Sequence, residues 1–84
     1  MDTEEKNQPE KRFLAGPISA SVWVNKVTRD GHEGEYRSVT LQRAYKDKND
    51  QWQHTSSLRV NDLPRASLVL DKAYEFIVLS EAQN

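Results

Sequence analysis

Residues 16–27 alternate between two kinds of side chain, and this period of two constrains the fold more than any other feature of the chain. One parity holds the apolar side chains Ile18, Ala20, Val22 and Val24, and the other holds Ser19, Ser21, Trp23 and Asn25. Because side chains along a strand point alternately to the two faces of a sheet, the pattern predicts a half-buried strand. Its sheet needs a second layer against the apolar face and leaves the other face open.

Two later segments repeat this period. Residues 36–46 are predicted as a strand with Val39 and Leu41 inward, and the opposite parity holds Tyr36, Ser38, Thr40 and Gln42. Residues 52–60 are predicted as the next strand. Its inward parity holds Leu58 and Val60 together with Trp52 and His54, and its outward parity holds Gln53, Thr55, Ser57 and Arg59.

The connections carry turn residues. Residues 28–35 contain Asp-Gly and a further glycine and are predicted as a loop. Residues 47–51 are polar, as in a turn that closes a hairpin. Residues 13–15 are all apolar and could extend the first strand.

The period changes at a helix start signal. Asn61 or Asp62 can cap the first turn, Pro64 falls inside that turn, and a helix is predicted from Leu63 to Leu79. At 100° per residue its apolar side chains form one arc of about 160°. That arc holds Leu63, Ala66, Val69, Leu70, Ala73, Tyr74, Phe76 and Ile77. The far side carries Leu68, Lys72, Glu75 and Leu79, which are either surface residues or a seam with a second protomer.

The expected fold is therefore α+β: a three- to four-stranded antiparallel meander followed by one long C-terminal helix packed on one sheet face. A chain of 84 residues has room for one domain and a thin core. It has no cysteine, so disulfides and cysteine-ligated metals are excluded, and a homodimer is the expected way to bury more surface. We expect residues 13–84 to form the domain.

The N-terminal residues 1–12 are polar, charged and aperiodic, so we expect a disordered arm there. They lack the apolar stretch of a secretory signal, and no segment of the sequence is apolar for long enough to span a membrane. The expected location is the cytoplasm.

The outward parities predict an open sheet face rich in hydroxyl and amide groups, with Trp23 and Tyr36 and without a carboxylate. The three predicted strands contain five basic residues and no acid, because the acids fall in the connections, the N-terminal arm and the helix. A locally positive sheet with exposed rings suits a single-stranded nucleic acid, since bases stack on rings and cations attract phosphates.

We therefore expect a non-catalytic module that binds single-stranded nucleic acid, with DNA favoured over RNA. The residues expected to stack on bases are Trp23, Tyr36 and Tyr45. The residues expected to contact phosphates are Lys26, Arg37, Arg43, Lys46 and Arg59. Of these, Arg37, Arg43 and Tyr45 share the inward parity and would act at the sheet's rims.

A second interpretation stays open. Exposed strands favour threonine and aromatic residues for their propensity alone, and basic residues at sheet edges deter aggregation. On this interpretation the chain is a small dimeric protein–protein interaction domain, docking through the open sheet face or the Leu68–Leu79 side of the helix.

The order of elements resembles a group of known families. The strand of residues 36–46, then residues 57–64 (SLRVNDLP) leading into the helix, resemble the Whirly, PUR-repeat and positive-cofactor-four transcriptional coactivator families. The likeness is one of architecture and covers about residues 13–80. It implies a dimer whose helices pack together or across subunits, and single-stranded DNA or RNA bound on sheet surfaces. Those families generally have four strands per repeat or protomer.

Catalytic and metal-binding motifs are not recognisable in the sequence. His54 is close to Ser56 and Ser57 in sequence alone, and a triad is defined by spatial geometry. Residues 30–35 offer carboxylates and one histidine but no second histidine at helical spacing. The three glycines form no phosphate-binding loop. We expect no enzymatic activity, no metal and no small-molecule cofactor.

Overall fold

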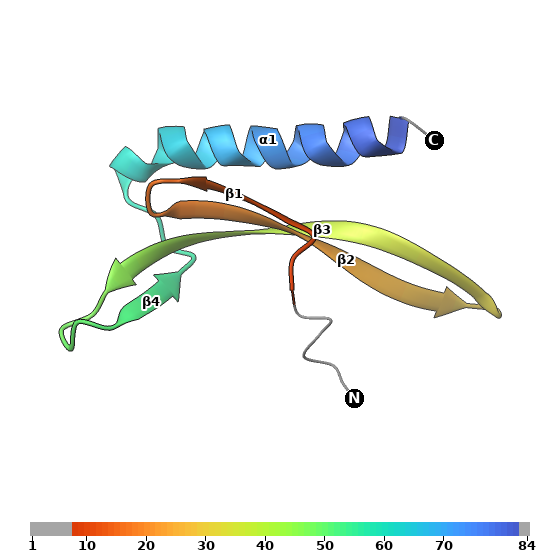
Figure 1. Ribbon diagram of the computed structural model, residues 1–84, viewed down its shortest axis with the longest axis horizontal. Helices are drawn as coiled ribbons and strands as arrows, with labels where there is room; N and C mark the ends of the chain where they lie inside the picture. The colour runs from red at the N-terminus through yellow and green to blue at the C-terminus, as the bar shows by residue number, and fades with distance from the viewer. Residues whose placement is uncertain (1–7, 83–84) are drawn as a thin grey trace.

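The structure is a computed structural model that describes residues 8–82, and it consists of one sheet and one helix (Figure 1). The elements in chain order are β1 (Lys11–Ala15), β2 (Ile18–Arg29), β3 (His32–Lys46), β4 (Trp52–Thr55), the 3-10 turn η2 (Val60–Asp62) and α1 (Leu63–Ala82). The strands pair in the order β1-β2-β3-β4, each antiparallel to the next. The predicted meander followed by one long helix is confirmed, with four strands.

The fourth strand comes from the apolar residues 13–15. They do not extend the first predicted strand but belong to β1, which begins at Lys11 within the range expected to be an arm. Residues 1–7 of the predicted arm lie outside the described residues. Gly16 and Pro17 turn the chain back into β2, and Gly16 has a φ of 61°, a conformation that glycine adopts without strain.

The loop predicted for residues 28–35 is absent, and this expectation was wrong. Both strands continue to a turn of two residues, because Asp30 and Gly31 have φ values of 52° and 78°. Positive φ at both central residues is what a type I′ turn requires, and its twist matches that of the flanking strands. As Figure 1 shows, β2 and β3 form a long twisted ribbon that runs well beyond β1.

The strand predicted for residues 52–60 was also too long, since β4 ends at Thr55. Its parity was wrong because Leu58 and Val60, which set it, lie beyond the strand; Leu58 packs against the core, but Val60 is 80% exposed. The register pairs Lys46 with Trp52 and Arg43 with Thr55. Trp52 and His54 therefore share the face away from the helix, whereas Gln53 and Thr55 share the helix-facing side.

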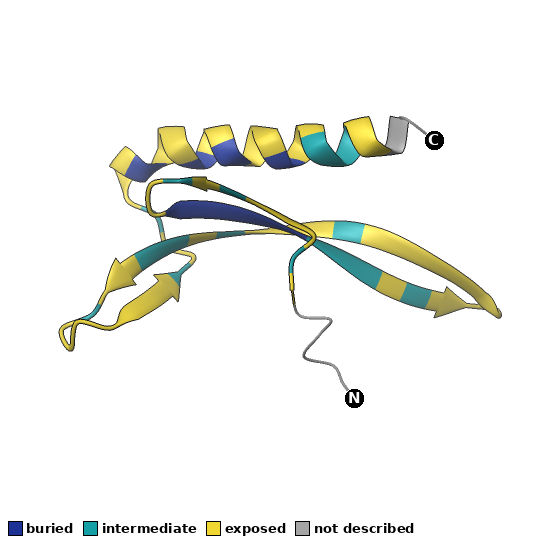
Figure 2. Ribbon diagram, viewed as in Figure 1, coloured by how far each residue is buried: buried dark blue, intermediate teal, exposed yellow. Residues whose placement is uncertain are grey.

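The core lies between α1 and the first two strands (Figure 2). Its buried apolar side chains come from β2 and from one side of the helix: Ile18, Ala20, Val22, Ala66, Val69 and Ala73. Phe13 of β1 meets Phe76 of α1 edge to face, with ring centroids 6.2 Å apart. The predicted inward parity of β2 and the inward side of the helix are thus confirmed.

The rest of the predicted helix arc is not covered. Leu63, Leu70 and Tyr74 are exposed, because a narrow contact with β1 and β2 buries only the centre of the arc. The radius of gyration is 15.4 Å, against about 12 Å for a compact domain of this length. Within the described residues no helix is long and apolar enough to cross a membrane.

The junction before α1 is fixed by one buried carboxylate. Asp62 Oδ2 accepts a hydrogen bond from the backbone N–H of Arg59 at 2.8 Å and lies 3.4 Å from Arg43 Nε. The same Nε donates to the carbonyl of Ser57 at 3.2 Å. This cluster ties the start of the helix to the end of β3.

Candidate nucleic-acid interface

The strand register defines the sheet face turned away from α1, called here the outer face. Its residues are Arg12, Leu14, Ser19, Ser21, Trp23, Asn25, Val27, Arg29, His32, Gly34, Tyr36, Ser38, Thr40, Gln42, Ala44, Lys46, Trp52 and His54. Three of them are cations, at Arg12, Arg29 and Lys46, and two are histidines. None of the strand residues on this face is an aspartate or glutamate.

The acidic residues of the strands are sorted by face and not by element. The expectation that strands carry no acid was wrong, because β3 begins at His32 and includes Glu33 and Glu35. These carboxylates lie on the helix-facing side, where the register pairs them with Thr28 and Lys26. The longer strand therefore leaves the acid-free character of the outer face intact.

Two aromatic residues lie on the ribbon part of the outer face. Trp23 is half-buried and its indole N–H donates to Thr40 Oγ1 at 2.8 Å. Beside it, Asn25 Nδ2 donates to Ser38 Oγ at 3.0 Å. Tyr36, directly opposite Asn25, is 57% exposed. The hydrogen bond fixes the indole against the sheet, and the phenol ring projects toward solvent.

A third ring lies at the other end of β3. Trp52 is 64% exposed, and Lys46 Nζ lies 5.5 Å from its ring centroid, within the range of a cation–π contact. Lys46 Nζ is also 3.9 Å from an oxygen of Asp50. His54 follows on the same face, opposite Ala44.

The turn that carries Trp52 is held by Asp47. One carboxylate oxygen accepts from the backbone N–H groups of Asn49 and Gln51, at 2.9 and 3.0 Å. The other accepts from Gln53 Nε2 at 3.0 Å. These hydrogen bonds, chiefly those from Gln51 and Gln53, hold the pKa of Asp47 below its ordinary value. The turn therefore presents Trp52 on a well-supported hairpin.

Four of the residues predicted to contact nucleic acid, three for phosphates and one for stacking, lie on the helix-facing side. Lys26, Arg37, Arg43 and Tyr45 all share that side by register. Arg37 donates to both carboxylate oxygens of Glu10, at 2.8 and 3.2 Å, and this hydrogen-bonded pair lowers the pKa of Glu10.

The remaining predicted residues divide between two places. Arg59 lies between β4 and η2, off the sheet. Trp23, Tyr36 and Lys46 lie on the outer face. Arg43 is committed to the junction with Asp62 and its guanidinium is 5.7 Å from the Tyr45 ring.

Among the arginine, histidine and tryptophan side chains of the outer face, sequence reasoning missed Arg12, Arg29, His32, Trp52 and His54. Trp52 and His54 were assigned to the wrong parity through Val60. Arg29 and His32 fell in the predicted loop, although Asp30-Gly31 between two alternating segments is itself the signal of a two-residue hairpin turn. Arg12 fell in the predicted arm.

The residues predicted to join protomers lie on the exposed side of α1. Leu68 and Leu79 are both more than half exposed. Lys72 Nζ and Glu75 Oε1 are 3.6 Å apart, an ion pair in solvent between these leucines. The contacts in the structure leave this side of the helix open.

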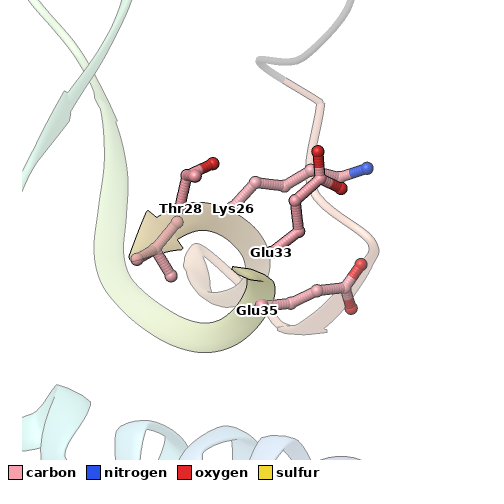
Figure 3. A pocket seen from close by; sticks show the side chains of 6 residues that line it. Lys26, Thr28, Glu33 and Glu35 are labelled. Atoms are coloured by element: carbon pink, nitrogen blue, oxygen red, sulfur yellow. The ribbon is translucent and has the colours of Figure 1, made fainter. Parts of the chain in front are cut away.

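A hollow near the tip of the ribbon measures about 480 Å³ (Figure 3). Its side chains include Lys26, Thr28, Glu33 and Glu35. All four are exposed, and Figure 3 shows Lys26 and Glu33 extending to the same side of the ribbon. Charges of both signs in solvent offer neither a desolvated catalytic group nor a cation cage.

In residues 8–82 no three histidine, aspartate or glutamate side chains gather as metal ligands. No family model matches the chain, and neither a curated protein nor a solved structure matches it. The outer face is thus the surface on which rings, cations and hydrogen-bonding groups come together.

Proposed function

We propose that the chain is a non-catalytic module that binds single-stranded nucleic acid, DNA in preference to RNA, on the outer face. One observation carries the proposal: this face of the sheet combines Trp23, Tyr36 and Trp52 with three cations and has no carboxylate among its strand residues. A polyanion meets cations there, and the carboxylate of Asp50, 3.9 Å from Lys46 Nζ, belongs to the turn and not to a strand.

The chemistry of the face suits unpaired bases. Stacking of a base on an aromatic side chain contributes about 1–3 kcal/mol, and every base offers a face for it. The indole N–H of Trp23 already donates a hydrogen bond to Thr40. Trp23 is therefore expected to contact a base by stacking of its ring and not by a hydrogen bond. Serine, threonine and glutamine side chains supply neutral donors for phosphates. We expect binding with little sequence preference.

Architecture supports the proposal at a coarser level. The sheet of four antiparallel strands followed by one helix has the element order of the Whirly, PUR-repeat and positive-cofactor-four families, to which the sequence bears its resemblance. Proteins of those families bind single strands on sheet surfaces.

The test is the tryptophan fluorescence of the whole chain titrated with a sixteen-residue oligothymidylate at 50 mM salt, with a duplex of equal length as control. We expect quenching by the single strand that weakens as salt is raised, because phosphate neutralisation releases counterions. A folded sample whose emission and electrophoretic mobility do not respond to the single strand would contradict the proposal.

A second candidate function is protein–protein interaction, with a homodimer as its simplest form. The observation that favours it is the uncovered apolar surface of α1, where Leu68 and Leu79 lie on one side and Leu70 and Tyr74 on another. Solution mass separates the cases. Leu68→Lys halves the mass if the predicted side joins protomers, Leu70→Lys does so if the other side does, and a wild-type monomer contradicts dimerisation.

A further inference from the structure

The rings of the outer face form two separate groups along β3. Trp23 and Tyr36 lie on the ribbon and are called here the ribbon station. Trp52 with Lys46 and His54 lies at the β3–β4 hairpin and is called the hairpin station. The first station matches the sequence prediction, whereas the second depends on the short β4 that the structure defines.

The register gives the spacing of the stations. Trp23 pairs with Ser38 and Trp52 pairs with Lys46, so the two rings are eight residues apart along β3. At about 3.3 Å per residue, eight residues cover about 26 Å of strand. The molecule is 49 Å along its longest axis, so this span fits within it.

The outer-face side chains of β3 between the stations are small or neutral. They are Thr40, Gln42 and Ala44. This stretch has no ring on which a base could stack and no charge that would repel a phosphate. It forms a low, neutral stretch between two aromatic sites.

One ring in each station has supporting contacts within the chain before any ligand binds. The indole of Trp23 is fixed by its hydrogen bond to Thr40. Trp52 sits on the hairpin that Asp47 braces, with the Lys46 ammonium near its ring. Preorganised rings lose little conformational freedom on binding, so each station can act as an anchor.

Resting on the proposed function, we propose that the ligand is one nucleic-acid strand laid along β3 that occupies both stations at once. At the spacing of stacked bases, about 3.4 Å, eight nucleotides cover the distance between the rings, and an extended strand needs fewer. A strand of four nucleotides is too short to join the stations. A ligand running across the strands would use one station and leave the other empty.

The experiment combines oligonucleotide length with single substitutions. The affinities of dT4 and dT16 are measured by fluorescence anisotropy for the wild-type chain, Trp23→Ala and Trp52→Ala. For dT16 each substitution weakens binding tenfold or more, since the strand loses one of two linked anchors. For dT4 each weakens binding about twofold, because the remaining station still accepts the short strand.

Tyr45→Ala is the matched control. Tyr45 is an exposed ring on the same strand, next to Lys46, but on the helix-facing side. Its removal leaves the affinity for dT16 unchanged. Circular dichroism melts of all three variants establish that each is folded at the temperature of the titration.

The outcomes separate the two proposals. If dT16 binds the wild-type chain but Trp52→Ala binds it equally well, the strand does not reach the hairpin station and this inference is overturned while the function stands. Equal losses for dT4 and dT16 also overturn it. If neither oligonucleotide binds the folded wild-type chain, the proposed function itself fails.

Discussion

At the scale of single residues, two carboxylates organise the backbone that supports the sheet. Asp62 is 8% exposed and joins the backbone of Arg59 to the guanidinium of Arg43 at the base of α1. Asp47 holds the β3–β4 turn by accepting hydrogen bonds from the backbone of Asn49 and Gln51 and from the Gln53 side chain. Both carboxylates are engaged within the chain, and they determine the position of the β3–β4 hairpin and of the start of α1.

Asp62→Ala tests the first of these. Removing the carboxylate leaves Arg43 nearly buried without its ion pair and the Arg59 N–H without its acceptor, so the free energy of unfolding falls by about 2–4 kcal/mol. Asp62→Asn keeps an acceptor oxygen and loses less. Urea denaturation measures both, and equal stability of Asp62→Ala and wild type would show that the cluster contributes nothing.

Asp47 makes the free energy of unfolding depend on pH. Its pKa in the folded state is lowered from the ordinary value of 3.8 by the turn's hydrogen bonds. Because the folded state binds this proton more weakly than the unfolded state, the stabilisation is complete at neutral pH. It is lost as the pH falls from 3.8 through the folded-state value.

The measurement is the unfolding free energy of wild type and Asp47→Asn between pH 7 and pH 3. The wild-type chain loses more stability than the variant in the acid part of the range. Parallel curves for the two proteins would show that Asp47 has no part in the acid sensitivity.

At the scale of elements, the β2–β3 ribbon decides how much outer face exists. Its length depends on a turn that needs positive φ at Gly31. A Cβ at Gly31 or at Gly34 would meet nothing within 4 Å, so the two glycines differ in backbone conformation and not in available space. This makes them a matched pair.

Gly31→Ala places a Cβ on a left-handed residue, which costs about 1–2 kcal/mol. Gly34→Ala has no such cost and stays within about 0.5 kcal/mol of wild type. The measurement is the hydrogen-exchange rate of the backbone amides paired between β2 and β3. We expect faster exchange in Gly31→Ala than in Gly34→Ala, because the ribbon opens more often. Equal protection in both variants would contradict the turn geometry.

Alternation in the sequence predicts which side chains share a face, but not where a strand ends. The register confirms the parity of residues 18–24 and 36–42. Ile18, Ala20 and Val22 are buried and Leu41 packs against them, whereas Val39, also predicted inward, is exposed. Val60 led to the wrong parity for β4, because the sequence pattern does not distinguish an apolar residue beyond the end of a strand from one inside it. Ion pairs that bridge distant segments, such as Arg37 with Glu10, depend on the folded twist and leave no local signal.

At the scale of the whole molecule, the shape is a thin core with a long projecting ribbon. Buried apolar side chains come only from β2 and α1 within the described residues, and much of the helix surface remains apolar and open. The molecule thus has two unlike surfaces: a charged, ring-bearing sheet face and an apolar helix side. We assign the first to nucleic acid and leave the second to a protein partner.

The assignment of the outer face is tested most directly by reversing one charge on each surface. Lys46 and Lys72 have similarly exposed side chains, at 49% and 53%, and each pairs with one acid, but they lie on opposite sides of the molecule. Lys46→Glu and Lys72→Glu change the net charge equally. The measurement is the affinity for dT16 against salt concentration, with the solution mass of each variant recorded.

Lys46→Glu is expected to weaken binding at least tenfold at about 0.1 M salt and to reduce the slope of log affinity against log salt by about one. Lys72→Glu keeps the wild-type slope and binds within about twofold, since exposed charges beyond a Debye length of about 10 Å are largely screened. Equal losses in the two variants, or a wild-type chain that binds no single strand, would contradict the account.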